Sequence, residues 1–216
     1  MNTKSFRINE IFYSLQGEGF NTGRAAVFIR FAGCNLRCPF CDTEFDSYSE
    51  MTSSEIVEAI RQYPARFAVL TGGEPTLQVD EDFVALLHDH GYTVAMESNG
   101  TRPAPRNLDW LTVSPKSRPV SLDGKTPDEL KIVFDESTDP EAQLSTLNSQ
   151  LSALNSQLST LNSQLSTLNS PLLFLQPCDT GNAERNAQIL KQCIGYIEQH
   201  PQWRLSLQTH KLTGIK

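Results

Sequence analysis

Cys34-Asn35-Leu36-Arg37-Cys38-Pro39-Phe40-Cys41 contains three cysteines in the spacing C-x3-C-x2-C. A cubane cluster of four irons is normally held by four thiolates. A loop with three cysteines either uses a distant fourth ligand or leaves one iron free to bind a substrate or cofactor. A cluster iron without a protein ligand indicates that the loop serves catalysis and not only structure. The spacing therefore predicts an iron–sulfur cluster with Cys34, Cys38 and Cys41 as ligands.

Two other uses of these cysteines fit less well. A closed zinc site usually pairs C-x2-4-C with H-x3-5-H, and none of the four histidines forms such a motif near the run. A disulfide framework is disfavoured because there are five cysteines, three of them in one loop, and the N-terminus shows no secretory pattern. We therefore expect a reducing, cytoplasmic environment. Cys178 and Cys193 fit small buried residues.

Length and composition indicate one folded domain that acts on something small. The chain has 216 residues, of which 38% are hydrophobic, so we expect a single domain over residues 1–216. Its formal net charge of -7 argues against nucleic acid as a partner. No apolar run approaches the roughly 20 residues needed to span a bilayer, so we expect no membrane partner.

Short β-rich runs alternate with helical patterns along most of the chain, which predicts an α/β fold with a parallel sheet. Near-continuous apolar runs are typical of strands covered on both faces. Catalytic groups gather at the carboxyl ends of such strands, and the cysteine run follows one of them. Helices are predicted from the capping box at Thr52-Ser53-Ser54-Glu55, over residues 80–90 and over 182–200. Strands are predicted at residues 7–13, 26–31, 67–70, 93–97, 111–113, 130–134, 172–175 and 204–207.

Residues 143–170 interrupt this pattern with four tandem copies of Gln-Leu-Ser-Thr-Leu-Asn-Ser, in which Ala153 replaces one threonine. The leucines are spaced alternately three and four residues apart, as in an a/d heptad. Ser, Thr and Asn are mediocre helix formers, and no charge is present to select a partner helix. We expect a surface insertion that forms a helix and has no catalytic role.

Thr71-Gly72-Gly73-Glu74-Pro75 follows the strand predicted at residues 67–70, at the same edge of the sheet as the cysteine loop. Glycines let a ligand approach the backbone, and a carboxylate can hold an ammonium group. Alone this motif fits an ordinary turn. Together with C-x3-C-x2-C it resembles the radical S-adenosylmethionine (SAM) enzymes. That resemblance implies an incomplete, TIM-like βα barrel with a 4Fe-4S cluster whose open iron binds SAM.

Seven further segments narrow the resemblance, namely residues 14–19, 28–36, 41–43, 97–101, 114–116, 176–177 and 207–211. They resemble one branch of that family, the enzymes that convert 6-carboxy-5,6,7,8-tetrahydropterin to 7-carboxy-7-deazaguanine with loss of ammonia. The product is a precursor of queuosine-type tRNA modification. The resemblance implies that SAM is cleaved reductively and that its radical takes hydrogen from C6 of the pterin before the ring contracts.

The resemblance also implies roles for single residues, while none acts as a catalytic acid or nucleophile because the cofactor carries the radical. Thr43 is expected to bind Mg2+. Without the resemblance, Arg30 fits a surface ion pair, and Gln16 and Glu18 fit a polar turn. The residues expected to contact SAM are Gly73, Glu74, Ser114, Pro115, Lys116, Gln176, Pro177, Cys178 and Asp179. Those expected to contact the substrate are Leu15, Gln16, Gly17, Glu18, Arg30, Thr71, His210 and Lys216, the last through the terminal carboxylate.

Two other functions fit parts of the pattern. An activase of glycyl-radical enzymes shares the short chain and the cysteine spacing, and a non-catalytic iron–sulfur or zinc module shares the cysteines. The first is disfavoured by the Gln-Gly-Glu-Gly and Gln-Thr-His-Lys segments, and the second gives Arg30 and residues 72–75 no use. The resemblance further implies an electron donor such as flavodoxin or ferredoxin and a homodimer.

Overall fold

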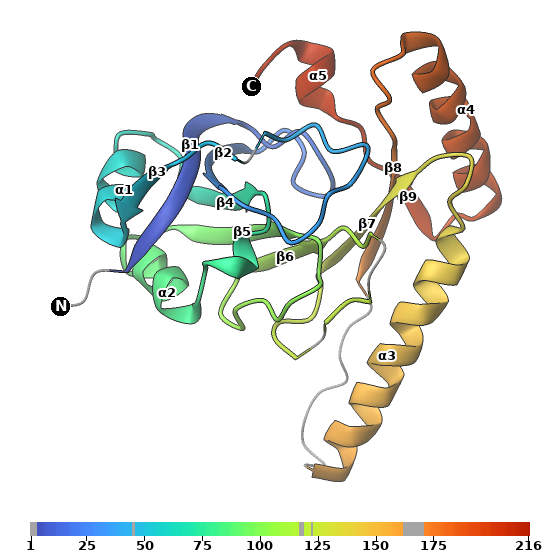
Figure 1. Ribbon diagram of the computed structural model, residues 1–216. Coiled ribbons are helices and arrows are strands. Elements are labelled where there is room, and N and C mark those ends of the chain that lie inside the picture. Colours follow the sequence, from blue (N-terminus) through green and yellow to red (C-terminus); the bar gives the residue numbers. More distant parts are fainter. Residues whose placement is uncertain (1–3, 45, 117–118, 122, 162–170) are drawn as a thin grey trace.

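The fold is built on a nine-stranded sheet, seen in the computed structural model in Figure 1. The structure describes residues 4–44, 46–116, 119–121, 123–161 and 171–216. The strand order is β3-β1-β2-β4-β5-β6-β7-β8-β9. The strands are β1 (Ser5–Leu15), β2 (Ala25–Phe31), β3 (Ser49–Thr52), β4 (Phe67–Gly72), β5 (Thr93–Ser98), β6 (Trp110–Val113), β7 (Glu129–Phe134), β8 (Leu172–Pro177) and β9 (Trp203–Leu205).

Most of the sheet is parallel and it stays open. β1 pairs antiparallel with β2 and β3, while each neighbouring pair from β2 through β9 is parallel. β3 and β9 are the two edges, and in the described part of the chain they do not pair with each other. The prediction of an α/β fold with an incomplete barrel is therefore confirmed.

Helices connect several of the parallel strands. They are α1 (Ser53–Arg61), α2 (Glu81–Asp89), α3 (Pro140–Leu161), α4 (Ala183–Gln199) and the short α5 (Thr209–Thr213), with a 3-10 turn, η1 (Pro75–Leu77). The predicted capping box is present: Thr52 and Glu55 satisfy each other's backbone amides at the start of α1. Among the described residues, no helix is long and apolar enough to cross a membrane.

The sequence predicted all the parallel strands but missed three short elements. β3, η1 and α5 have three to five residues each, too few for a periodic pattern to show. The predicted strand at residues 204–207 lies at β9, which ends at Leu205. The expected alternation of strands and helices also fails at two connections. The described parts of the β5–β6 and β6–β7 connections contain no helix.

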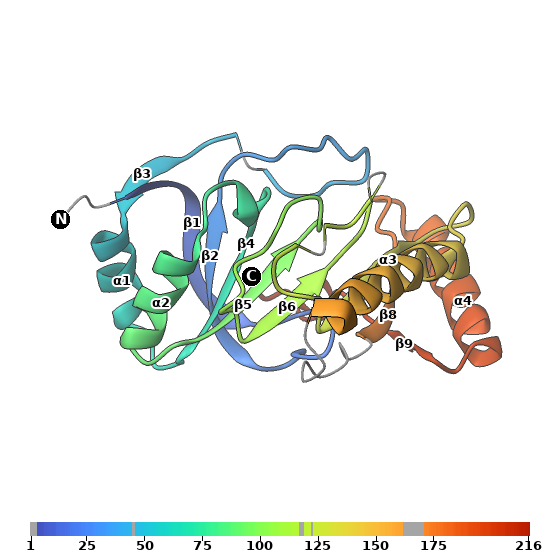
Figure 2. The same ribbon diagram turned by 90° about the horizontal axis from the view of Figure 1, so that it is seen from below.

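The heptad repeat contributes to α3, as the leucine spacing predicted. The helix begins before the repeat, at Pro140. It starts beside the β7–β8 end of the sheet, and its C-terminal end projects away from the sheet (Figures 1 and 2). Its first copy joins the core, because Leu147 is buried and Leu144 packs against the same cluster. Gln150 donates a hydrogen bond from Nε2 to the carbonyl oxygen of Val120 at 3.1 Å. Residues 162–170 lie outside the described part.

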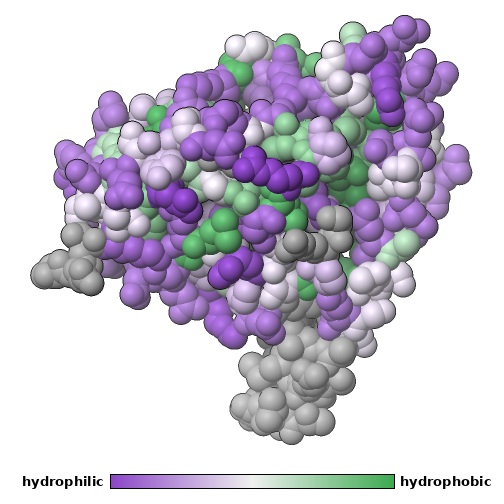
Figure 3. All heavy atoms as spheres, viewed as in Figure 1, coloured by the Kyte–Doolittle hydropathy of each residue, from purple (hydrophilic) through white to green (hydrophobic). Residues whose placement is uncertain are grey.

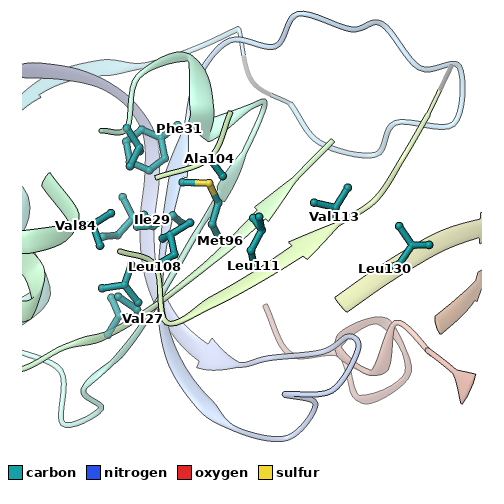
Figure 4. Close-up of a cluster of buried hydrophobic side chains, with 14 of the residues drawn as sticks. Val27, Ile29, Phe31, Val84, Met96, Ala104, Leu108, Leu111, Val113 and Leu130 are labelled. Carbon is teal, nitrogen blue, oxygen red and sulfur yellow. The ribbon is translucent and has the colours of Figure 1, made fainter. Parts of the chain in front are cut away.

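Alternation along the strands separates two faces. Val27, Ile29 and Phe31 of β2 point toward α2 and pack in the main core with Val84 (Figure 4). Phe28 points the other way, into a smaller cluster with neighbouring strands. Because successive side chains point to opposite faces, residue 30 falls on the second, inner face. The same alternation sets the inner residues of β4, β5, β7 and β8, and these form the floor of the site.

Candidate active site

A pocket of about 520 Å³ lies at the carboxyl ends of the parallel strands. Its volume is in the range of small-molecule sites. The inner faces of five strands supply its floor through Arg30, Thr71, Glu97, Lys131 and Gln176. The space-filling view shows hydrophobic residues near the middle of one face with hydrophilic residues around them (Figure 3).

The fold brings nearly all of the predicted site residues to this one pocket. Only Glu74 and Pro115 are not among its lining residues. The predicted residues that line it are Leu15, Gln16, Gly17, Glu18, Arg30, Cys34, Cys38, Cys41, Thr43, Thr71, Gly73, Ser114, Lys116, Gln176, Pro177, Cys178, Asp179, His210 and Lys216. Their individual ligand contacts stay predictions.

The cysteine loop follows β2 directly and turns tightly. The amide of Cys41 donates to the carbonyl oxygen of Cys38 at 3.1 Å, and the amide of Leu36 donates to the sulfur of Cys34 at 3.4 Å. Burial raises the pKa of Cys38, Lys116 opposes that rise, and the other two cysteines add to it. The pKa of Cys38 stays raised overall, and Lys116 is the neighbouring charge that favours the thiolate that iron requires.

The three thiols fit an iron–sulfur cluster better than a single ion. They line the same pocket, but among the described residues no three His, Cys, Asp or Glu side chains gather closely enough to hold one metal ion. Zinc needs its ligands to converge on one point, whereas in a cubane each cysteine binds a different iron. Cys34 and Cys38 are half-buried and Cys41 is exposed, so the cluster edge would lie near the surface.

The Gly72-Gly73-Glu74 segment packs directly against the cysteine loop. Gly73 donates its amide hydrogen to the carbonyl oxygen of Phe31, and Glu74 donates to that of Gly33, both at 2.9 Å. Gly72 has a φ of 117°, a conformation that favours glycine. The two loops of the predicted cofactor site therefore hold each other through their backbones.

The Glu74 side chain is turned into the protein instead of lining the pocket. It is fully buried and accepts hydrogen bonds from Thr76, from the Ser98 hydroxyl at 2.9 Å and from the Asn99 amide at 2.7 Å. These donors leave the carboxylate well satisfied. Its predicted contact with SAM stays a prediction, while Gly73 presents the backbone of this motif to the pocket.

Two asparagines connect the cysteine loop to the loop after β5. Asn99 donates from Nδ2 to Asn35 Oδ1 at 3.0 Å and approaches the sulfur of Cys34 at 4.0 Å. Asn35 in turn donates to the Thr101 hydroxyl at 2.7 Å. Sequence reasoning recognised both segments as motifs but assigned these side chains no role.

A buried network of charges lies on the floor of the pocket. Lys131 Nζ is 2.5 Å from Glu18 Oε2 and 2.9 Å from Glu97 Oε2. Gln208 donates to Glu18 and Gln16 donates to Glu97, at 3.0 and 3.2 Å. Burial alone would raise the pKa of Glu18, but Lys131 and Gln208 lower it to about 2. Glu97, Lys131 and Gln208 were missed by sequence reasoning, although a lysine inside the apolar run of β7 was a signal.

Arg30 and Thr43 lie where a ligand could reach them. The Arg30 guanidinium lies over the Phe12 ring at 5.4 Å, and its Nε is 3.9 Å from Glu10. Within the described residues this Nε has no hydrogen-bond partner. Thr43 is half-buried on the pocket wall, two residues after Cys41.

The C-terminal segment is tied to the pocket at several points. Thr209 donates its amide hydrogen to the Gly17 carbonyl oxygen at 2.9 Å. Lys211 Nζ bridges Asp42 and Asp179 at 2.6 and 2.7 Å, which joins α5 to the cysteine loop and to the loop after β8. At the chain end, Ser14 donates its hydroxyl to the carbonyl oxygen of Lys216 at 2.6 Å.

Comparison with known proteins defines the class first. The Radical SAM superfamily model matches residues 28–141, which include the cysteine loop, the glycine motif and the strands that carry them. The chain is a radical SAM enzyme, and it uses a 4Fe-4S cluster and SAM.

Relatives that match nearly the whole chain show which family within this superfamily it belongs to. A 7-carboxy-7-deazaguanine synthase from Bacteroides thetaiotaomicron is 43% identical over 210 residues, covering 97% of this chain and 98% of the relative. One from Bordetella pertussis is 39% identical, covering 98% and 99%. The crystal structure of QueE from Escherichia coli matches with a TM-score of 0.69 at 26% identity, covering 94% of this chain and 93% of that one. The chain belongs to the 7-carboxy-7-deazaguanine synthase family.

Proposed function

We propose that this chain converts 6-carboxy-5,6,7,8-tetrahydropterin to 7-carboxy-7-deazaguanine and releases ammonia. The observation that carries the proposal is that one pocket holds the three cysteine thiols together with Gln16, Glu18 and Arg30. A cluster bound by these thiols and a polar substrate would therefore share one enclosed space. Membership of the synthase family supports the same reaction.

The cofactor side of the pocket fits a cluster with one open iron. Cys34, Cys38 and Cys41 would hold three irons. When bound together, the cluster and SAM supply a carbon radical that removes a hydrogen atom from the substrate. The residues that would contact SAM beside the cluster are Gly73, Ser114, Lys116, Gln176, Pro177, Cys178 and Asp179, which line the pocket, together with Glu74 and Pro115, which do not.

The substrate side offers groups that match a carboxylated pterin. Arg30 lines the pocket, where its guanidinium would bind the substrate carboxylate, and it lies over the Phe12 ring. Gln16 and Glu18 would receive the polar edge of the ring. Leu15, Gly17, Thr71 and His210 would complete the walls, and Lys216, which also lines the pocket, would reach the substrate with its terminal carboxylate.

Mg2+ would bind beside the substrate carboxylate, with the Thr43 hydroxyl as its protein ligand. Mg2+ commonly keeps several waters and takes its other ligands from the substrate. The position of Thr43 on the pocket wall supports this assignment. The ion would neutralise the carboxylate and help to orient the ring.

The remaining partners follow from the same reaction. The cluster needs one electron for each initiation, which a flavodoxin or ferredoxin would donate near the exposed Cys41. None of the five cysteines forms a disulfide, which suits the reducing cytoplasm that we propose. We further propose that the active form is a homodimer and that residues 1–216 form one domain, with the repeat at 143–170 as an insertion.

An anaerobic assay tests the function. The reconstituted protein is incubated with SAM, dithionite, Mg2+ and the tetrahydropterin, and the products are identified by mass spectrometry. We expect 7-carboxy-7-deazaguanine to form with wild type and not with Cys38→Ala. The proposal is wrong if an intact cluster cleaves SAM and no deazaguanine appears.

A further inference from the structure

Lys131 occupies an unusual position on the floor of the pocket. Its side chain is only 5% exposed, yet it lines the cavity, between Glu18 of the β1–β2 loop and Glu97 of β5. A buried ion pair is weak evidence for stability, because desolvation offsets most of the attraction. The position of this one, at the bottom of a ligand pocket, indicates a role in recognition.

Lys131, Glu18 and Glu97 keep hydrogen-bonding groups that a ligand could use. An ammonium group has three donors, and within the described residues Lys131 uses two of them, one on each carboxylate. The four carboxylate oxygens of Glu18 and Glu97 each accept one side-chain hydrogen bond, with Gln208 and Gln16 as the other donors. Each of these oxygens has a second lone pair. The floor therefore presents one donor beside several acceptors.

We propose that Lys131 is the specificity-determining residue that selects a 2-amino-4-oxopyrimidine ring, by donating its third hydrogen to the 4-oxo oxygen. The adjacent ring N–H and the 2-amino group then face the carboxylates of Glu18 and Glu97. This proposal rests on the proposed function and identifies the ring edge that the pocket recognises.

The pattern also explains which rings are rejected. A 2,4-diamino ring places an amino group where the oxo oxygen would be. The N–H donors of that amino group would then face the N–H donor of Lys131, and neither would find an acceptor. A buried donor left without an acceptor weakens binding strongly. Lys131 would thus discriminate between rings of the same size and shape.

Binding of two stable probes to the cluster-reconstituted full chain tests this inference. The probes are pterin-6-carboxylate and 2,4-diaminopteridine-6-carboxylate, titrated at pH 8 and followed by their fluorescence. We expect wild type to prefer the oxo ring by roughly 10- to 100-fold, the range of one charge-assisted hydrogen bond. In Lys131→Gln that preference should fall to within a few-fold, because an amide can donate or accept.

Controls separate recognition from folding. Lys125→Gln removes a lysine that pairs with Asp128 outside the pocket, and it should leave the preference unchanged. If Lys131→Gln does not fold, Lys131→Gln/Glu97→Gln removes one charge of each sign and should lose the preference in the same way. If Lys131→Gln leaves the ratio of the two affinities unchanged, whether or not both probes bind more weakly, the proposed role of Lys131 is wrong while the proposed function still stands. If wild type binds neither probe, the proposed function fails as well.

Discussion

Gly73 packs so closely on Gly33 that a Cβ atom at position 73 would lie 2.0 Å from the Gly33 carbonyl oxygen. The obstacle is backbone, which cannot move aside as a flexible side chain could. We predict that Gly73→Ala displaces the cysteine loop, lowers the iron bound per chain and reduces the free energy of unfolding by roughly 1–3 kcal/mol.

The control for that change is Gly195→Ala. Gly195 lies within α4, and a Cβ atom added there would meet no atom of the described residues within 4 Å. Alanine at this position should stabilise the helix by about 0.5–1 kcal/mol and leave the iron content unchanged. Iron analysis and urea unfolding measure both effects. Equal iron content in the two variants would show that the glycine contact does not position the cluster.

Lys211 should act on substrate affinity through the C-terminal segment. Lys211→Met breaks its bridges to Asp42 and Asp179, so α5 would be held over the pocket only by its remaining contacts, such as that of Thr209 with Gly17. Because these pairs are partly exposed, we expect KM for the pterin to rise only about tenfold, with little change in iron content. Steady-state kinetics measure the effect, and Lys211→Arg should restore most of it. An unchanged KM in Lys211→Met would contradict this role.

Glu129 should make stability depend on pH. Burial, followed by repulsion from Glu97, raises its pKa to about 7, although the Phe20 amide and Lys131 oppose the rise. The folded state therefore holds a proton that the unfolded state loses near pH 4.5. The stabilisation is fully present below pH 4.5 and is lost as the pH rises to about 7, by up to about 3 kcal/mol.

Glu129→Gln mimics the protonated form and should flatten that change. Urea unfolding of wild type and the variant at pH 5 and pH 7.5 gives the comparison. We expect the variant to be relatively more stable at pH 7.5 than at pH 5. The same difference between the two proteins at both pH values would show that Glu129 does not titrate in this range.

The repeat should be dispensable beyond its first copy. Deleting residues 150–163 removes two heptads and brings Gln164 to the place of Gln150, so the helical phase is nearly kept. We expect this variant to fold and to retain its activity. Leu147→Ala should lose about 2–5 kcal/mol of unfolding free energy, since Leu147 is buried. Thermal unfolding of the deletion variant tests this prediction. A large fall in its melting temperature would show that the later copies of the repeat are needed for stability.

The sequence predicted the parallel strands because they are near-continuous apolar runs, and it predicted α1, α2 and α4 from their caps. It could not predict β3 or α5, whose short polar segments are held by contacts with distant residues such as Gly17. Side-chain direction was also hidden. Glu74 lies in a motif that indicates ligand binding, yet its carboxylate is buried and accepts hydrogen bonds from Thr76, Ser98 and Asn99.

Pairing across the pocket was the other feature that sequence alone could not reveal. Lys131 and Glu18 are 113 positions apart, and only the assembly of the sheet brings them to 2.5 Å. The cysteine loop was predictable because cluster ligands lie close together in sequence. The recognition groups come from strands and loops far apart in the chain, so their partnership depends on the fold.

Transfer of deuterium from the substrate tests the central claim that cofactor and pterin react in this one pocket. The reconstituted chain is given SAM, dithionite and a tetrahydropterin labelled with deuterium at C6, and 5'-deoxyadenosine and SAM are analysed by mass spectrometry. We predict that deuterium appears on the adenosyl carbon. Formation of 5'-deoxyadenosine without any deuterium, while the cluster stays intact, would contradict the account.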